Sequence, residues 1–118
     1  MDVADLNEIY DDAFDAIQEA GARRGVEFEA PLIFEELFMN VKTHAYGKGS
    51  GPVIINAHEE ERGIVITVAD CGCEFNIIEY KPKDLKPVGG RGIITISAFS
   101  KEMSYQRFGG LNINSVVV

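Results

Sequence analysis

Hydrophobic residues in the first part of the chain recur at the spacing of an α-helix. Between residues 4 and 20 they share one helical face, at positions Leu6, Ile9, Ala13, Ile17 and Ala20. The opposite face is acidic, so this stretch predicts an amphipathic helix. Gly21 and Gly25 follow the pattern, and we expect them to end the helix.

A second helix is predicted from Pro31 to about Tyr46, because proline is well tolerated in the first turn of a helix. Apolar side chains cover most of its circumference. Glu36, Asn40 and His44 are four residues apart and therefore share one narrow polar stripe. This stripe is the first candidate for a functional site.

Two pairs of β-rich runs follow the helices. Residues 53–58 and 64–69 are joined by a charged turn, and residues 102–108 and 111–118 are joined across two glycines. Each pair predicts a β-hairpin.

The segment between the two hairpins is irregular and contains a glycine cluster at residues 89–92. A short apolar run over residues 93–99 predicts a further helix directly after it. Helices before and between two hairpins predict an α+β fold of two layers, with helices packed on one face of a single sheet.

Composition limits the classes of partner. The chain has 118 residues, 46% of them hydrophobic, which indicates a single domain over residues 1–118. Its formal net charge of -8 repels phosphate backbones and anionic lipid, so neither nucleic acid nor a membrane is expected as a partner. An anionic ligand would need local binding groups, such as backbone amides, a few basic side chains or a divalent cation.

Nothing in the sequence predicts export or membrane insertion. Residues 1–7 lack the basic and then apolar run of a signal peptide, and no apolar stretch approaches the roughly 20 residues of a membrane span. We therefore expect a cytoplasmic protein.

Cys71 and Cys73 are separated by one residue, which is too close for an ordinary disulfide, so reduced thiols are expected. The neighbouring carboxylates of Asp70 and Glu74 oppose thiolate formation and disfavour a redox role. A zinc site shared with histidines is also disfavoured, because Cys-x-Cys is not the usual spacing of a zinc-binding cysteine pair.

The polar stripe of the second helix suits phosphate chemistry. An amide oxygen, as on Asn40, is a hard ligand for Mg²⁺, and the carboxylate of Glu36 can accept a proton from a hydroxyl that attacks a phosphate. Taken alone, the stripe suits an ordinary solvated helix face better.

Asp70 and Gly72 stand at the end of the predicted strand over residues 64–69. A carboxylate there can accept a hydrogen bond from the exocyclic amine of adenine, and glycine lets the backbone approach the base closely. An ordinary turn also explains this pair when it is considered alone.

The glycine cluster before the third helix is the last candidate. The free amides at a helix N-terminus bind phosphate readily, and the alternative is a flexible hinge. The residues concerned are Gly89, Gly90, Arg91 and Gly92.

The order of these three segments resembles the N box, G1 box and G2 box of the GHKL ATPases, the histidine-kinase-like group, over nearly the whole chain. Within that group the sequence is most similar to the bacterial anti-sigma-factor serine kinases, and it has no phosphoacceptor histidine helix. The matching positions are Glu36, Asn40, His44-Ala-Tyr46, Asp70-x-Gly72, Phe75-Asn76, Gly89-Gly90-x-Gly92-Ile93, Tyr105-x-Arg107, Gly110 and Asn112. One position departs from many relatives, since Glu74 stands where a second glycine is common in the G1 box.

The resemblance implies a two-layer sandwich with a mixed, mostly antiparallel sheet, and it implies ATP and Mg²⁺ as ligands. In these roles Glu36 activates the attacking hydroxyl, and Asn40 holds Mg²⁺. The remaining assignments are His44 beside the nucleotide, Asp70 and Gly72 at adenine, Gly89, Gly90 and Gly92 around the phosphates, and Arg91 within the site.

The resemblance also implies partners. They are a sigma factor, which the domain sequesters, and an anti-anti-sigma protein of the STAS type, on which it phosphorylates a serine or threonine. Two alternatives stay open, a nucleotide-dependent binding module without kinase activity and an interaction domain that binds no nucleotide. The early start of the first helix leaves the oligomeric state, including a homodimer, undecided.

Overall fold

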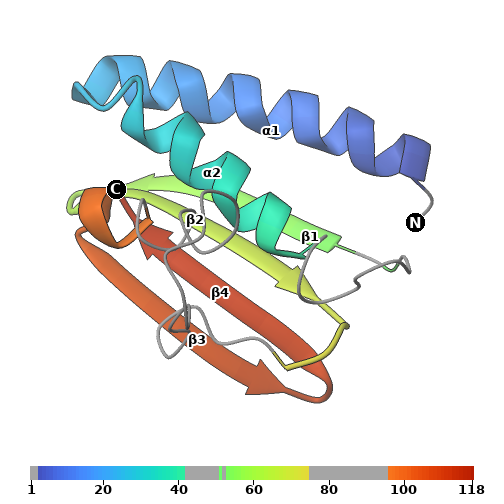
Figure 1. Ribbon diagram of the computed structural model, residues 1–118. Coiled ribbons are helices and arrows are strands. Elements are labelled where there is room, and N and C mark those ends of the chain that lie inside the picture. The colour runs from blue at the N-terminus through green and yellow to red at the C-terminus, as the bar shows by residue number, and fades with distance from the viewer. Residues whose placement is uncertain (1–2, 42–50, 52, 75–95) are drawn as a thin grey trace, which may run out of the picture.

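The structure, a computed structural model, describes residues 3–41, 51, 53–74 and 96–118, with side chains described from Tyr10 onward. The elements in chain order are α1 (Val3–Arg24), α2 (Glu29–Asn40), β1 (Val53–Glu60), β2 (Gly63–Asp70), β3 (Glu102–Phe108) and β4 (Leu111–Val117). Figure 1 shows the two helices together on one side of the sheet. This α+β arrangement of two layers confirms the predicted fold class.

The first helix is longer than its apolar pattern predicts, because α1 continues through Gly21 to Arg24. Gly25 ends it with a positive φ of 75°, a conformation that glycine adopts without strain. The amide of Val26 then donates to the carbonyl oxygen of Gly21 at 2.9 Å, the bond that closes this kind of helix end. A side chain at position 21 would collide with the carbonyl of Val26, so glycine here serves the close approach and does not end the helix.

The second helix begins two residues earlier than predicted, at Glu29, so that Pro31 lies within its first turn. Its aromatic side chains pack against α1 through Tyr10, whose ring centroid lies 5.1 Å from that of Phe34 and 4.9 Å from that of Phe38. In the described part of the chain, no helix combines the length and apolarity needed to span a membrane.

The four strands form one sheet in the order β1-β2-β4-β3, and each described pair of strands is antiparallel. Both predicted hairpins are therefore confirmed. The pairing that joins them is between β2 and β4, and it sets Asp70 directly opposite Asn112. On the other side of β2, Asp70 lies opposite Val53 of β1.

The core lies between the helices and the sheet. Alternate residues of β2 and β4 face the helices, and they pack against the apolar face of α1 and α2. The largest fully buried apolar side chains are Ile17, Ile33, Phe34, Leu37, Ile64, Ile66, Val68, Ile96 and Val116. Asp70 and Asn112 follow the same alternation, so the pleat turns two polar side chains toward the helical layer.

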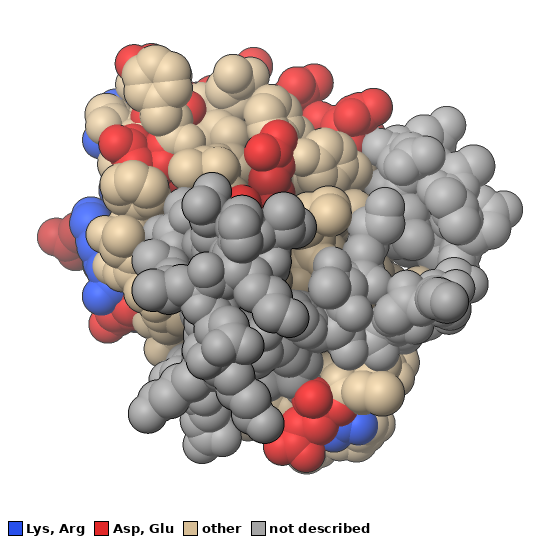
Figure 2. Space-filling view, viewed as in Figure 1, with Lys and Arg blue, Asp and Glu red and all other residues tan. Residues whose placement is uncertain are grey.

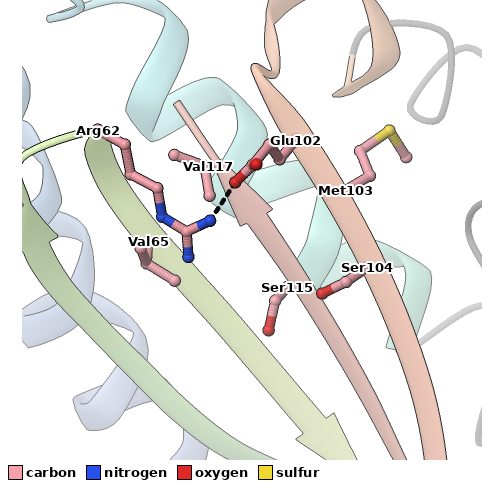
Figure 3. Close-up of a pocket in the computed structure, with 7 residues that line it drawn as sticks. All are labelled: Arg62, Val65, Glu102, Met103, Ser104, Ser115 and Val117. Carbon is pink, nitrogen blue, oxygen red and sulfur yellow. Dashed lines mark hydrogen bonds and ion pairs between the residues drawn. The ribbon is translucent and has the colours of Figure 1, made fainter.

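The opposite face of the sheet carries an open pocket of about 410 Å³. Figure 3 shows that Arg62 and Glu102 pair at one end of it, while Ser104 and Ser115 project into it from neighbouring strands. Of the predicted site residues that the structure describes, none lines this pocket. We therefore place the candidate site elsewhere.

Exposed ion pairs connect the end of α1 with the hairpin of β1 and β2. Arg23 and Arg24 both contact the carboxylate of Glu59, at 2.8 and 3.1 Å. Such pairs contribute little to stability because solvent screens the charges.

Candidate functional site

Glu36 and Asn40 lie one turn apart on α2, and both are half-buried. The helix carries them because its apolar face is anchored in the core by Ile33 and Leu37. One helical turn between them points both side chains in similar directions. The structure therefore presents a carboxylate and a carboxamide together on α2, as the polar stripe predicts.

Burial raises the pKa of the Glu36 carboxyl above its ordinary value, and the nearby charge of Glu35 raises it further. Beside Glu36 is a cavity of about 360 Å³ between the two helices, which is also lined by Tyr10, Phe38 and Met39. A carboxylate with a raised pKa accepts a proton more readily than an ordinary one. Glu36 is thus suited to act as a base beside a space that a second molecule can enter.

The side chain of Asn40 has a buried amide nitrogen, Nδ2, without a hydrogen-bond partner among the described residues. A buried polar atom without a partner is costly, so this carboxamide has binding capacity left for a ligand. Its oxygen and nitrogen exchange places by a rotation of the amide, and the oxygen is a ligand that Mg²⁺ accepts.

The donor set at Asn40 fits Mg²⁺ in the manner typical of nucleotide sites. Such an ion keeps several waters and binds to phosphates, with only one or two protein ligands. Asn40 would supply one oxygen, and no larger group of His, Cys, Asp or Glu that could hold a metal occurs within the described ranges. The metal would therefore arrive with the phosphates of a nucleotide.

Asp70 ends β2 with only 2% of its surface exposed, which is unusual for a carboxylate. Its Oδ1 accepts a hydrogen bond from the amide of Gly72 at 2.9 Å and another from Nδ2 of Asn112 at 2.9 Å. These two bonds fix the orientation of the carboxylate. They also fix the backbone at Gly72, the second residue that the sequence assigns to this part of the site.

Asn112 is the centre of a hydrogen-bond network around this loop, and it is completely buried. Besides Asp70, its Nδ2 reaches the carbonyl oxygen of Cys73 at 2.7 Å. Its Oδ1 accepts from the hydroxyl of Tyr105 at 2.7 Å and from Nη1 of Arg107 at 2.9 Å. The last two strands thereby hold the loop that follows β2.

The guanidinium of Arg107 also donates to the carbonyl oxygen of Gly72 at 3.2 Å. The sequence resemblance includes Tyr105, Arg107 and Asn112 but implies a role in the site for none of them. The sequence of β4 gives no signal of such a role, because asparagines that alternate with apolar residues are expected to face solvent, yet the structure buries Asn112 and Asn114. Buried asparagines in a strand indicate a polar partner nearby.

The two described parts of the site come from different layers. Glu36 and Asn40 belong to α2, while Asp70 and Gly72 belong to the end of β2. In Figure 1, α2 and β2 run toward the same end of the domain. His44 and the glycine-cluster positions Gly89, Gly90, Arg91 and Gly92 lie outside the described residues, so their assignments stay predictions.

The charge of the described surface agrees with the composition. Figure 2 shows acidic side chains gathered over the helical part of the visible face, with fewer basic ones at its side. The exposed acidic residues of α1 include Asp11, Asp12, Asp15 and Glu19. An anionic ligand would therefore depend on backbone amides, individual cations such as Arg107, or a metal ion.

The geometry of a buried carboxylate at a strand end and an Asn-bearing helix agrees with comparisons of the whole sequence. Residues 2–117 match the family model described as the histidine kinase-like ATPase domain. A comparison with curated proteins finds none that matches the chain. ATPase domains of this group bind ATP, usually with Mg²⁺. Since the match covers nearly the full length, the chain belongs to the histidine kinase-like ATPase domain family.

Proposed function

We propose that this domain binds Mg-ATP and transfers the γ-phosphate to a serine or threonine of an anti-anti-sigma partner of the STAS type. In the same proposal it sequesters a sigma factor in the cytoplasm. Two observations carry the proposal: the buried, hydrogen-bonded carboxylate of Asp70 and the half-buried carboxyl of Glu36 with its raised pKa, because each suits a different task in nucleotide chemistry.

Asp70 is assigned to recognition of the adenine base. Its Oδ1 is already held by Gly72 and Asn112, which orients the carboxylate before any ligand binds. A carboxylate that is fixed in this way loses little conformational freedom on binding. The exocyclic amine of adenine would donate a hydrogen bond to this carboxylate, and Gly72 would allow close approach of the ring.

Glu36 is assigned to the transfer step. Its raised pKa favours acceptance of the proton that the partner's hydroxyl loses as its oxygen bonds to the γ-phosphorus. The cavity between Glu36, Tyr10 and Met39 gives the partner's side chain a place to enter. Bound Mg²⁺ would neutralise phosphate charge, and Asn40 would hold it.

The partners are proposed from the sequence resemblance to anti-sigma serine kinases. The acidic surface over α1 is compatible with a protein partner and unfavourable for nucleic acid. The same proposal allows a homodimer. Sedimentation of the isolated chain measures whether two copies of the domain associate.

Transfer of labelled phosphate to a STAS-type partner tests the function. Wild type, Glu36→Gln and Asp70→Asn are incubated with γ-labelled ATP, Mg²⁺ and the partner, and ATP binding is measured separately. We expect Glu36→Gln to bind ATP but to transfer at least about 100-fold more slowly, the contribution of a general base. Asp70→Asn should lose ATP binding.

Transfer by Glu36→Gln at the rate of wild type would contradict the role of Glu36. ATP binding without any transfer by wild type would support the alternative of a nucleotide-dependent binding module. A chain that binds neither ATP nor ADP would be an interaction domain of another kind, and the proposal would then be wrong.

A further inference from the structure

Two cysteines flank the part of the loop that the network around Asp70 holds. Cys71 and Cys73 are both exposed to solvent, and Gly72 separates them. The segment Cys71-Gly72-Cys73 directly follows Asp70, the last residue of β2. Both thiols are therefore accessible to small molecules at one edge of the candidate nucleotide site.

The side chains of three residues, Asp70, Arg107 and Asn112, hold the backbone of Gly72 and Cys73. The amide of Gly72 donates to Asp70, and its carbonyl accepts from Arg107 at 3.2 Å. The carbonyl of Cys73 accepts from Asn112 at 2.7 Å. A change at either cysteine is thus transmitted to the group that orients Asp70.

The carboxylate of Asp70, which precedes Cys71 in the sequence, is buried and hydrogen-bonded, and the guanidinium of Arg107 donates to the carbonyl of Gly72 between the two cysteines.

We propose that the pair of Cys71 and Cys73 is a site of reversible thiol modification that controls nucleotide binding. The inference rests on the proposed function, because it assigns regulation to the same site. The reagent is a low-molecular-weight disulfide. One cysteine thiolate attacks a sulfur of that disulfide, a protein mixed disulfide forms, and the second half of the reagent leaves as a thiolate that takes up a proton.

Neither Cys71 nor Cys73 forms a disulfide in the structure. An adduct on either thiol competes with a disulfide between the two, and the masses of the two products distinguish them. A bulky substituent on either residue then occupies the approach to Gly72 or pulls its backbone away from Asp70. Either effect separates the oriented carboxylate of Asp70 from the adenine base.

The test uses oxidised glutathione on the whole chain, with Cys71→Ser/Cys73→Ser as the matched control. Intact mass identifies the adduct, and titration with Mg-ATP measures affinity before treatment, after treatment and after reduction with dithiothreitol. We expect one glutathione adduct on wild type and at least about tenfold weaker ATP binding, the loss that accompanies one broken charged hydrogen bond. Reduction should restore the affinity, and the double variant should stay unmodified and bind ATP throughout.

An adduct that leaves ATP affinity unchanged would overturn the inference while the proposed function stands. The same holds if wild type remains unmodified in excess reagent, or if a disulfide between the two cysteines forms in place of the adduct. Failure of the reduced, untreated wild type to bind ATP would refute the proposed function itself, and regulation of that site would fall with it.

Discussion

Replacement of Asn112 by alanine is the most informative perturbation of the network around Asp70. The side chain is completely buried and joins the end of β2, the loop after it and the last hairpin. Alanine removes both of its donors and its acceptor. The buried carboxylate of Asp70 then loses one of the two hydrogen bonds described for Oδ1.

The magnitude follows from the contacts. A hydrogen bond to a charged group contributes about 1.5–3 kcal/mol, and neutral bonds contribute about 1 kcal/mol each. The lost bond to Asp70 is of the first kind, and the lost bond to the carbonyl of Cys73 is of the second. Water entering the vacated space offsets part of the loss, so we expect Asn112→Ala to lower the free energy of unfolding by about 3 kcal/mol.

Urea denaturation followed by circular dichroism measures this change. With a typical slope of about 1–3 kcal/mol per molar urea, the midpoint should fall by roughly 1–3 M while the slope stays constant. Asn56→Ala is the matched control, because Asn56 is an exposed residue of β1 and its loss should cost less than about 0.5 kcal/mol. If Asn112→Ala were as stable as this control, the network would not hold the loop and the reasoning would be refuted.

Three further predictions concern single positions. Glu36→Gln should be more stable than wild type at neutral pH. Because the pKa of Glu36 is raised in the folded state, proton binding stabilises folded wild type at low pH, and this stabilisation is lost as the pH rises through the folded pKa. Thermal unfolding from pH 4 to 8 should therefore show the stability of Glu36→Gln increasing relative to that of wild type, and a constant difference would be inconsistent with the raised pKa. Burial raises the pKa of Tyr10 from 10.0 to about 12, with help from nearby carboxylates, so wild type should lose stability relative to Tyr10→Phe between these pH values in urea titrations. Gly63→Ala should lower the free energy of unfolding by at least about 3 kcal/mol, because the new Cβ would clash with the carbonyl of Val118. Gly109→Ala, in open space at a φ of 56°, should lower it by about 1 kcal/mol. Equal unfolding midpoints of the two variants in urea would argue against the clash.

Much of the fold could be predicted because its signals are local. The 3.6-residue spacing of apolar residues predicts α1, and the two glycines at residues 109 and 110 predict the turn between β3 and β4. The end of α1 was predicted less well. Gly21 reads as a helix terminator in the sequence, yet it lies inside the helix because the chain returns across it at Val26.

The candidate site was predicted only in part. Glu36, Asn40, Asp70 and Gly72 were named from their spacing and their order along the chain. The role of Asn112 could not be named, because it depends on the register of β2 against β4, two strands that are far apart in sequence. Such a register is set by packing of both strands against the helices, so it becomes visible only in the folded chain.

Titration of the reduced wild-type chain with Mg-ATP, in parallel with Asp70→Asn, tests the central claim most directly. Isothermal calorimetry with a thermal-shift assay gives both the affinity and the stabilisation that a ligand of the folded state must produce. We predict saturable binding of one nucleotide to wild type and loss of that binding in a folded Asp70→Asn variant. Absence of binding to wild type, or equal binding to both proteins, would contradict the account.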